Sequence, residues 1–443
     1  MTIRKDLFLE GITYYVHRYG CWMNDRDADA IAGILELHGA VAAESAEQAD
    51  FVVFNTCSVS GIVEAKICNS LAHTSSESFL IVCGCFSQYA AKELAQRFPY
   101  INILMGAGKV DRLIDSIRMA IQSGETVIDE TAPSITPDHL PAVRGSRITA
   151  YVSIMNGCFN RCSYCIVPYV RGPIVNRAAN AIISEIQTLA QSGWREVTLV
   201  GHNVQQYSGE YRTNSLKQRR INFTDLLKLV ADTGIERIRF LTSNPADLTI
   251  ETLRLMADTE SLCPSLHLPL QSGSDVILAA MHRRYTKKEY IDLVRSFYNL
   301  MPNGSLTTDV IIGFPGETEE DFNQTYELYQ QLNFDGAYLF AYSLRPFTEA
   351  ALLPDQVPGS LILQRFNQLQ SLCDSQKKER AKRFKRTVQR VLITENNSLQ
   401  VRGISENGWH VTLLHKNSPE LGTICNVLIS SVIDGVLYGY PIT

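Results

Sequence analysis

Three closely spaced cysteines carry the clearest chemical signal in this chain. Cys158, Cys162 and Cys165, here called the first trio, form a C-x3-C-x2-C run directly after a strand-like stretch, residues 148–155. Three thiolates at this spacing can bind three irons of a cubane [4Fe–4S] cluster, whereas a ferredoxin cluster takes four. Zinc sites also normally take four ligands, and no further cysteine or histidine lies nearby. The run therefore predicts a cluster with one iron open to another ligand. The alternative is three inert, buried thiols.

Three more cysteines are spread over the first 140 residues, where strand-like and helix-like stretches alternate. This alternation predicts a parallel, doubly wound sheet. Cys21, Cys57 and Cys85, the second trio, each follow a predicted strand at the edge where open α/β sheets bind ligands. They can converge on a second cluster, again with one open iron. Cys68 and Cys83 are interpreted as core residues.

Composition and charge limit the function classes. The 443 residues are 45% hydrophobic and 20% charged, which is typical of a globular protein of about three domains. The sequence has no long apolar run, so it predicts no secretory signal and no membrane span, and we expect a cytoplasmic protein. In that compartment eleven cysteines indicate metal or cluster binding rather than disulfides.

From residue 148 onward, six strand-like stretches alternate with amphipathic helices. Six β/α units are too few for a closed eight-stranded barrel and predict an open, partial barrel. The loop of the first trio follows the first of these strands. Polar and glycine-rich clusters follow several others, at the same barrel mouth. There we expect contacts to cofactor or substrate from five residues: Gly201, Asn203, Ser243, Gln271 and Gly313.

The last part of the chain changes to short β-rich segments, which predict a small all-β barrel of the oligonucleotide-binding style. The net charge of the chain is −5, but residues 377–390 at the barrel's entry hold eight Lys/Arg and one Glu. That local charge suits a phosphate backbone, with a solvated helix face or linker as the alternative. We expect RNA contacts from four of these residues: Arg383, Lys385, Arg386 and Arg390. Residues 125–146, with three prolines, are predicted to be an interdomain linker.

The assembled motifs resemble the methylthiotransferase family of radical S-adenosylmethionine enzymes over nearly the whole chain. They are Tyr-Gly-Cys-Trp-Met-Asn (19–24), Asn-Thr-Cys-Ser-Val (55–59), Cys-Gly-Cys (83–85) and Gly-Cys-x3-Cys-x-Tyr-Cys-Ile-Val-Pro-Tyr-Val-Arg-Gly (157–172). The resemblance implies an N-terminal methylthiotransferase domain (1–140), a central radical (β/α)6 barrel (141–378) and a C-terminal TRAM barrel that binds RNA (379–443).

The resemblance also implies the cofactors, two [4Fe–4S] clusters and S-adenosylmethionine. The cluster on the first trio would cleave S-adenosylmethionine to a 5′-deoxyadenosyl radical. The cluster on the second trio would hold the sulfur atom that another S-adenosylmethionine methylates. Position 2 of adenine carries an unactivated C–H bond, which a carbon radical can attack and a side-chain acid or base cannot.

Within the family, the tRNA-2-methylthio-N6-dimethylallyladenosine synthases are most similar, because Gly201-His-Asn-Val-Gln-Gln-Tyr resembles their strand-end motif. This branch methylthiolates C2 of N6-(dimethylallyl)adenosine at position 37 of the tRNA anticodon loop. Departures from the branch include His202 for a usual glutamine, Ile174 for a common glutamate and Phe347 for a common glycine. Asn176-Arg177 for the usual Ser-Arg and Ser60-Gly-Ile for the usual Arg-Glu-Lys are two more. The alternatives are methylthiolation of threonylcarbamoyladenosine in tRNA or of a ribosomal-protein aspartate, and a non-enzymatic, metal-binding RNA-binding protein. We expect a monomer whose electron and sulfur donors the sequence does not identify.

Overall fold

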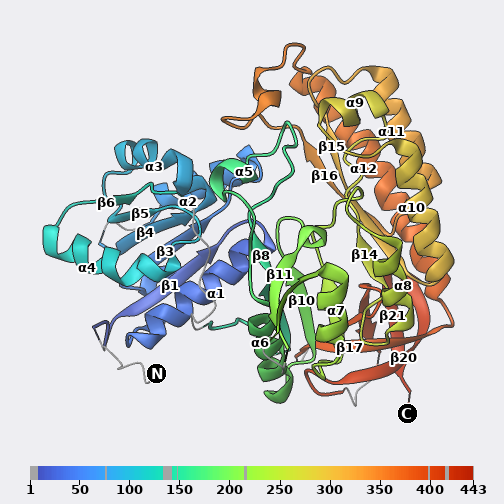
Figure 1. Cartoon of the computed structure of the whole chain (residues 1–443), viewed down its shortest axis with the longest axis horizontal. Helices are drawn as coiled ribbons and strands as arrows, with labels where there is room; N and C mark the ends of the chain where they lie inside the picture. The colour runs from blue at the N-terminus through green and yellow to red at the C-terminus, as the bar shows by residue number, and fades with distance from the viewer. Residues whose placement is uncertain are drawn as a thin grey trace.

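The computed structural model describes residues 8–74, 77–132, 142–146, 148–213, 217–397, 400–414 and 419–442. Figure 1 shows three parts: an N-terminal sheet flanked by helices, a central barrel of strands and outer helices, and a small barrel of strands at the C-terminal end. The mixed α/β class expected from the sequence is confirmed. The domain boundary expected between residues 140 and 141 lies outside the described residues.

The N-terminal part is a six-stranded parallel sheet in the order β2-β1-β3-β4-β5-β6. Its strands are β1 (Thr13–Arg18), β2 (Val41–Ala42), β3 (Phe51–Thr56), β4 (Phe79–Gly84), β5 (Ile103–Met105) and β6 (Val127–Asp129). Helices cover both faces, so β3 is buried along its whole length. One face carries α1 (Trp22–Leu37) and α4 (Leu113–Ser123), and the other carries α2 (Gly61–Ala72) and α3 (Cys85–Arg97).

Two features of this sheet bear on the predictions. The strand order reverses between β1 and β3, which is the switch point where doubly wound sheets bind ligands. The prediction that residues 125–146 are all linker is wrong at its start, because β6 pairs with β5 as the sixth strand. Three residues are too short to show a periodic pattern, and two of the three are only partly buried.

The central part has the six predicted strands, arranged as two three-stranded parallel sheets, β13-β10-β7 and β14-β15-β16. A parallel bridge joins Ile238 of β13 to Leu262, in the segment that precedes β14. The strands are β7 (Thr149–Ser153), β10 (Glu196–Val200), β13 (Arg237–Phe240), β14 (Ser265–His267), β15 (Ser305–Ile312) and β16 (Gly336–Ala341). Among the described residues β7 and β16 do not pair, so the barrel is open, as predicted.

Outer helices bury the apolar face of these strands in one core. They are α6 (Ala179–Gln191), α7 (Phe223–Ala231), α8 (Ile250–Asp258), α10 (Lys287–Leu300), α11 (Glu319–Gln331) and α12 (Gly359–Ala381). Shorter elements lie at the mouth of the central barrel: β8 (Met155–Asn156), α5 (Val167–Val170), β9 (Val175–Asn176) and α9 (Asp275–Ala280). An antiparallel hairpin of β11 (Ser208–Arg212) and β12 (Gln218–Asn222) is not predicted from the sequence, because its strands are mostly polar and exposed.

The C-terminal part is a closed five-stranded barrel in the order β17-β18-β19-β21-β20, consistent with a TRAM-like domain. Its strands are β17 (Val388–Asn396), β18 (Val401–Ser405), β19 (His410–Leu413), β20 (Ile424–Ile433) and β21 (Val436–Pro441). Val391, Val411, Val427 and Leu437 fill its core. Across the described residues, no helix is long and apolar enough to cross a membrane.

The C-terminal barrel is attached to the amino ends of the central strands. Arg237, fully buried at the start of β13, donates to the backbone oxygens of Ile404 at 2.8 Å and Ser405 at 2.9 Å. Trp409 Nε1 donates to Ser305 Oγ, at the start of β15, at 3.0 Å. The cysteine loops lie at the opposite, carboxyl ends of the strands, so the small barrel and the barrel mouth occupy opposite edges.

Candidate active site

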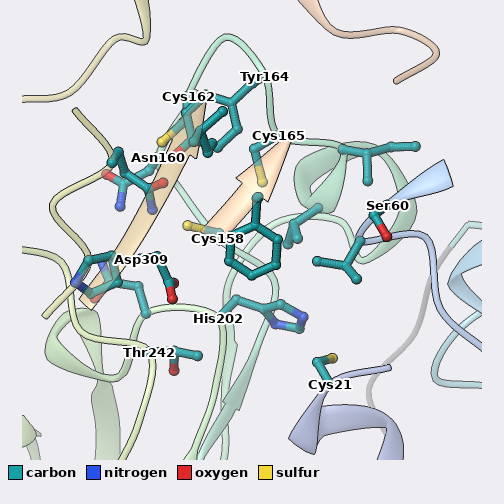
Figure 2. Close-up of a pocket in the computed structure, with 18 of the residues that line it drawn as sticks. Cys21, Ser60, Cys158, Asn160, Cys162, Tyr164, Cys165, His202, Thr242 and Asp309 are labelled. Carbon is teal, nitrogen blue, oxygen red and sulfur yellow. The ribbon is translucent and has the colours of Figure 1, made fainter. Parts of the chain in front are cut away.

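All six predicted cluster cysteines line one cavity of about 340 Å³ between the N-terminal sheet and the mouth of the central barrel. Figure 2 shows Cys158, Cys162 and Cys165 on one side of it and Cys21, at the start of α1, on the other. His202 lies between them in the same view. The fold therefore brings together two cysteine sets that come from distant parts of the sequence.

The second trio is positioned by the carboxyl ends of three adjacent strands. Cys21 caps the start of α1, Cys57 follows β3, and Cys85 is the first residue of α3. The turn into α3 requires Gly84, whose φ is +101° and whose Cβ, if present, would lie 2.4 Å from the Thr56 carbonyl oxygen. The pleat of β4 ends there, and the chain turns so that Cys85 lines the cavity.

The first trio is held by a tight loop that rests on α9. Gly157 opens the loop at φ +76°, and a Cβ there would lie 2.0 Å from the carbonyl oxygen of Pro173. Ser163 anchors the loop, because its Oγ donates to the Ala280 carbonyl at 2.7 Å and its backbone N–H donates to the Met281 carbonyl at 3.2 Å. The backbone of the loop that carries the three thiols is therefore held in one conformation.

Burial dominates the ionisation of three of these thiols. It raises the pKa of Cys158 to about 11 and of Cys165 to about 12, and it also raises the pKa of Cys85. A hydrogen bond from the Cys57 thiol lowers the pKa of Cys21 to about 6, and that bond raises the pKa of Cys57. Because cluster ligands are thiolates, binding iron here would release protons.

The donor set fits iron–sulfur clusters better than single metal ions. Within the described ranges, no group of three His, Cys, Asp or Glu side chains is arranged to hold one metal ion. A cubane of four irons bridges thiols that lie further apart than the ligands of one ion.

The cavity wall also offers free polar groups. Five buried atoms that belong to lining residues have no hydrogen-bond partner in the part of the chain that the structure describes: Asn203 Oδ1, Gln271 Oε1, His202 Nδ1, Tyr342 Oη and Arg345 Nε. Buried polar groups normally have partners, so these suit a polar ligand such as the amino and carboxylate groups of S-adenosylmethionine. Burial, with the charge of Arg171, lowers the pKa of His202 to about 3, so its imidazole is neutral near pH 7.

Four of the five residues expected at the barrel mouth line the cavity: Gly201, Asn203, Ser243 and Gln271. Gln271 adopts φ +67°, which is uncommon for a residue other than glycine and is typical of functional sites. Gly313 is the exception, because it is not among the lining residues. Its φ is +78°, a Cβ would lie 2.4 Å from Ile362 Cγ1, and its N–H donates to Glu317 Oε2 at 2.9 Å. That glycine serves packing against α12.

Sequence reasoning missed several lining residues. Thr242, a β-branched residue at φ +64°, follows β13, and its position at a strand end is the one signal that could have found it. His267 Nε2 lies 3.3 Å from Asp309 Oδ2, across β14 and β15. Arg283 Nη1 donates to Cys162 Sγ at 3.4 Å. These contacts join side chains far apart in the sequence, so no local sequence pattern predicts them.

The four residues expected to bind RNA fall into two pairs. Arg383 forms an ion pair with Asp335, and Arg390 Nη1 bonds Glu406 Oε1 at 2.8 Å. Lys385 and Arg386 are exposed. The charge available to a phosphate backbone therefore lies mainly on Lys385 and Arg386, and RNA binding by all four stays a prediction.

The open parallel barrel and the cysteine loop at its mouth define a radical S-adenosylmethionine fold. The model of the Radical SAM superfamily matches residues 152–329, and the model described as uncharacterized protein family UPF0004 matches residues 13–106. Among solved structures, the radical S-adenosylmethionine methyltransferase TsrM from Kitasatospora setae aligns with a TM-score of 0.55 at 15% identity. The alignment covers 76% of this chain and 74% of that one, and at this identity it supports the fold alone.

Curated relatives are closer in sequence. The tRNA-2-methylthio-N(6)-dimethylallyladenosine synthase of Caldicellulosiruptor saccharolyticus is 41% identical over 372 residues, covering 82% of this chain and 78% of the relative. The synthase of the same name from Clostridium tetani is 34% identical over 452 residues, covering 99% and 98%. The chain belongs to this synthase family. It is a radical S-adenosylmethionine methylthiotransferase, with S-adenosylmethionine and [4Fe–4S] iron–sulfur chemistry as its cofactors.

Proposed function

We propose that this enzyme methylthiolates C2 of N6-(dimethylallyl)adenosine at position 37 in the anticodon loop of tRNA. The observation that carries the proposal is the single cavity lined by both cysteine trios. A substrate atom in that cavity can be reached from both trios without moving between sites. Relatives named for this reaction, one of them aligned over 99% of this chain, support the same substrate.

In this proposal each trio holds its own [4Fe–4S] cluster. Cys158, Cys162 and Cys165 would hold the cluster that binds S-adenosylmethionine, and Cys21, Cys57 and Cys85 would hold the cluster that supplies sulfur. Together these groups supply the radical and the sulfur that an unactivated C–H bond requires. Asn203 and Gln271 hold the polar end of S-adenosylmethionine with the side-chain oxygens that lack partners.

The neutral ring of His202 stands between the trios and is proposed to contact the adenine. An imidazole that stays uncharged can donate one hydrogen bond and accept another, which matches the mixed edge of a purine. The base must leave its stack to enter the cavity, which is easiest in a loop such as the anticodon loop.

We further propose three functional units: residues 1–140 for the second cluster, 141–378 for the radical reaction and 379–443 for RNA. Lys385 and Arg386 contribute exposed positive charge to the RNA-binding unit. The enzyme is proposed to act on tRNA as a monomer in the cytoplasm.

Mass spectrometry of tRNA nucleosides tests the proposal. In a strain that lacks this protein, the 2-methylthio form of dimethylallyladenosine should vanish and dimethylallyladenosine should accumulate. The wild-type gene should restore the product, and Cys57→Ala and Cys162→Ala should not. Purified Cys57→Ala should still cleave S-adenosylmethionine, whereas Cys162→Ala should not. An unchanged nucleoside profile would refute the substrate, and threonylcarbamoyladenosine and ribosomal proteins would be examined next.

A further inference from the structure

Arg171 connects the loop of the first trio to the sheet that carries the second. It follows α5, and its side chain is 1% exposed. Its Nε donates to Cys85 Sγ at 3.0 Å, Nη1 donates to Asp27 Oδ2 at 2.7 Å, and Nη2 donates to Asn24 Oδ1 at 2.6 Å. All three partners belong to the N-terminal part of the chain. The planar guanidinium is thereby fixed in one orientation, with one N–H aimed at a sulfur.

A second arginine stands in the same relation to the first trio. Arg283 Nη1 donates to Cys162 Sγ at 3.4 Å, and its Nε donates to the Tyr285 hydroxyl at 3.2 Å. Each trio therefore has one arginine directed at one of its sulfurs. Arg283 lines the cavity, whereas Arg171 is not among the lining residues and lies behind Cys85. Arg171 can therefore act on a ligand in the cavity through its charge and through the groups that it holds.

The charge and hydrogen bonds around a cluster set how easily it accepts an electron. A buried positive charge stabilises the reduced cluster, because that state carries one more negative charge. An N–H bond to a ligand sulfur acts in the same direction. Both effects are strong at Arg171, because buried charges are weakly screened by water. The carboxylate of Asp27 is 7% exposed and offsets part of the arginine's charge.

We propose that Arg171 is a positioning residue that orients Cys85 and raises the reduction potential of a cluster on the second trio. This inference rests on the proposed function, because it requires that the second trio binds a cluster. If the two trios give their clusters different reduction potentials, one reductant can reduce the cluster on the first trio. The cluster on the second trio can then keep a defined oxidation state.

The midpoint potential of the second cluster tests this directly. We would use the full-length chain with Cys158, Cys162 and Cys165 replaced by alanine, so that only the second cluster contributes to electron paramagnetic resonance. At a fixed potential, Arg171→Gln should lower the reduced-to-oxidised ratio tenfold or more, which is a fall of about 59 mV for one electron. Asp27→Asn should shift the ratio the opposite way. Arg171→Lys keeps the positive charge but loses the planar guanidinium, so its reduced-to-oxidised ratio should lie between those of Arg171→Gln and the parent.

Arg365→Gln is the matched control. Arg365 is also buried and also forms an ion pair, with Glu317 at 2.9 Å, but neither residue lines the cavity or contacts a cysteine of either trio. It should leave the ratio unchanged. The inference is overturned if Arg171→Gln binds full iron at an unchanged potential, or if Arg171→Gln and Asp27→Asn shift the potential in the same direction. Loss of iron only in Arg171→Gln would support the orienting role at Cys85, and Arg171→Lys then reports the potential.

Failure of the proposed function gives a different result. If the parent chain without the first trio binds no iron, the second trio holds no cluster, and the proposed function fails before Arg171 is tested. If it binds about four irons, as a [4Fe–4S] cluster requires, the second trio holds a cluster and only the role of Arg171 is at issue.

Discussion

The carboxylate of Asp335, 2% exposed, binds the guanidinium of Arg383 where the C-terminal barrel meets the central part. Arg380 Nε reaches the same carboxylate at 3.2 Å, and the backbone N–H of Leu306 donates to it at 2.9 Å. Arg383 therefore contributes to the junction between the two parts. A cation held in this way is poorly placed to neutralise a phosphate, although it belongs to the most basic stretch of the sequence.

The exposed pair Lys385 and Arg386 should account for more of the tRNA affinity than Arg383. Replacing both by glutamine should weaken binding at low salt. It should also reduce the slope of log K against log salt by about 0.7 to 0.9 for each phosphate that the variant no longer neutralises. Binding would be titrated by fluorescence anisotropy at several salt concentrations. Arg383→Gln is the control and should instead lower the unfolding free energy. An unchanged slope in the double variant would show that these two side chains do not bind phosphates.

Phe347 should contribute to tRNA binding by stacking on a base. Its ring is 61% exposed and lies 6.0 Å from that of Tyr169, which is 47% exposed. Phe347 lies just beyond Arg345, which lines the cavity, and its φ is +67°. Such a backbone conformation is costly for a bulky residue, which favours a functional role. Phe347→Ala should weaken tRNA binding by about 1 kcal/mol or more, since one stacked base contributes that much.

Leu352→Ala is the control for Phe347, because Leu352 is also apolar and is 87% exposed, but has no aromatic ring. Its affinity should match the wild type, and Phe347→Tyr should keep most of the affinity. Equal losses in Phe347→Ala and Leu352→Ala would contradict stacking. Affinity would be measured at one salt concentration for all variants, because phosphate binding changes with salt.

Much of the fold could be predicted because buried parallel strands are continuous apolar runs with turn residues between them. The two trios could be placed at strand ends for the same reason, and the convergence of the three cysteines of the second trio follows from the rule that parallel strands end at one edge. Short or polar elements escape this reasoning. β6 has three residues, and the β11–β12 hairpin has polar strands, so neither has a clear period.

The contacts that complete the site could not be predicted, because they depend on tertiary packing. Arg171 and Cys85 are separated by 86 positions in the chain and meet only when the two parts pack together. The glycine-rich sequence around Gly313 favours a place at the mouth, yet the glycine is required by packing on Ile362. A residue type indicates what a position can do, and only the packing shows which neighbour it meets.

The Asp129 carboxylate should make stability depend on pH in acid. Burial opposes its ionisation, but hydrogen bonds from Thr131 and Lys109 prevail and lower its pKa from 3.8 to about 2. Because the folded pKa lies below the unfolded one, this stabilisation is complete above about pH 4 and is lost as the pH falls toward 2. Urea unfolding of wild type and Asp129→Asn at several acidic pH values would measure it. The two curves should converge as the pH falls, and a constant difference would contradict this assignment.

Replacing Gly84 should damage both the sheet and the second trio. Gly84→Ala must keep φ near +101° with its Cβ 2.4 Å from a backbone oxygen, so the strand end has to move. The cost should be about 3 kcal/mol, because a conformation open mainly to glycine costs about 1 to 3 kcal/mol before any clash. Gly124→Ala is the control. Gly124 also has positive φ, +68°, but a Cβ there meets nothing within 4 Å, so we expect about 1 kcal/mol.

Urea unfolding of the reduced, iron-free protein would compare these two glycine variants, and iron would be counted after reconstitution. Gly84→Ala should retain about four irons, those of the first trio, because Cys85 follows the displaced turn. Gly124→Ala should retain about eight, because its helix end lies away from every cysteine of either trio. Equal iron content in the two variants would show that the turn at Gly84 does not position Cys85. The difference in unfolding free energy between the two variants would then report only the cost of adding a methyl group at residue 84 in the sheet.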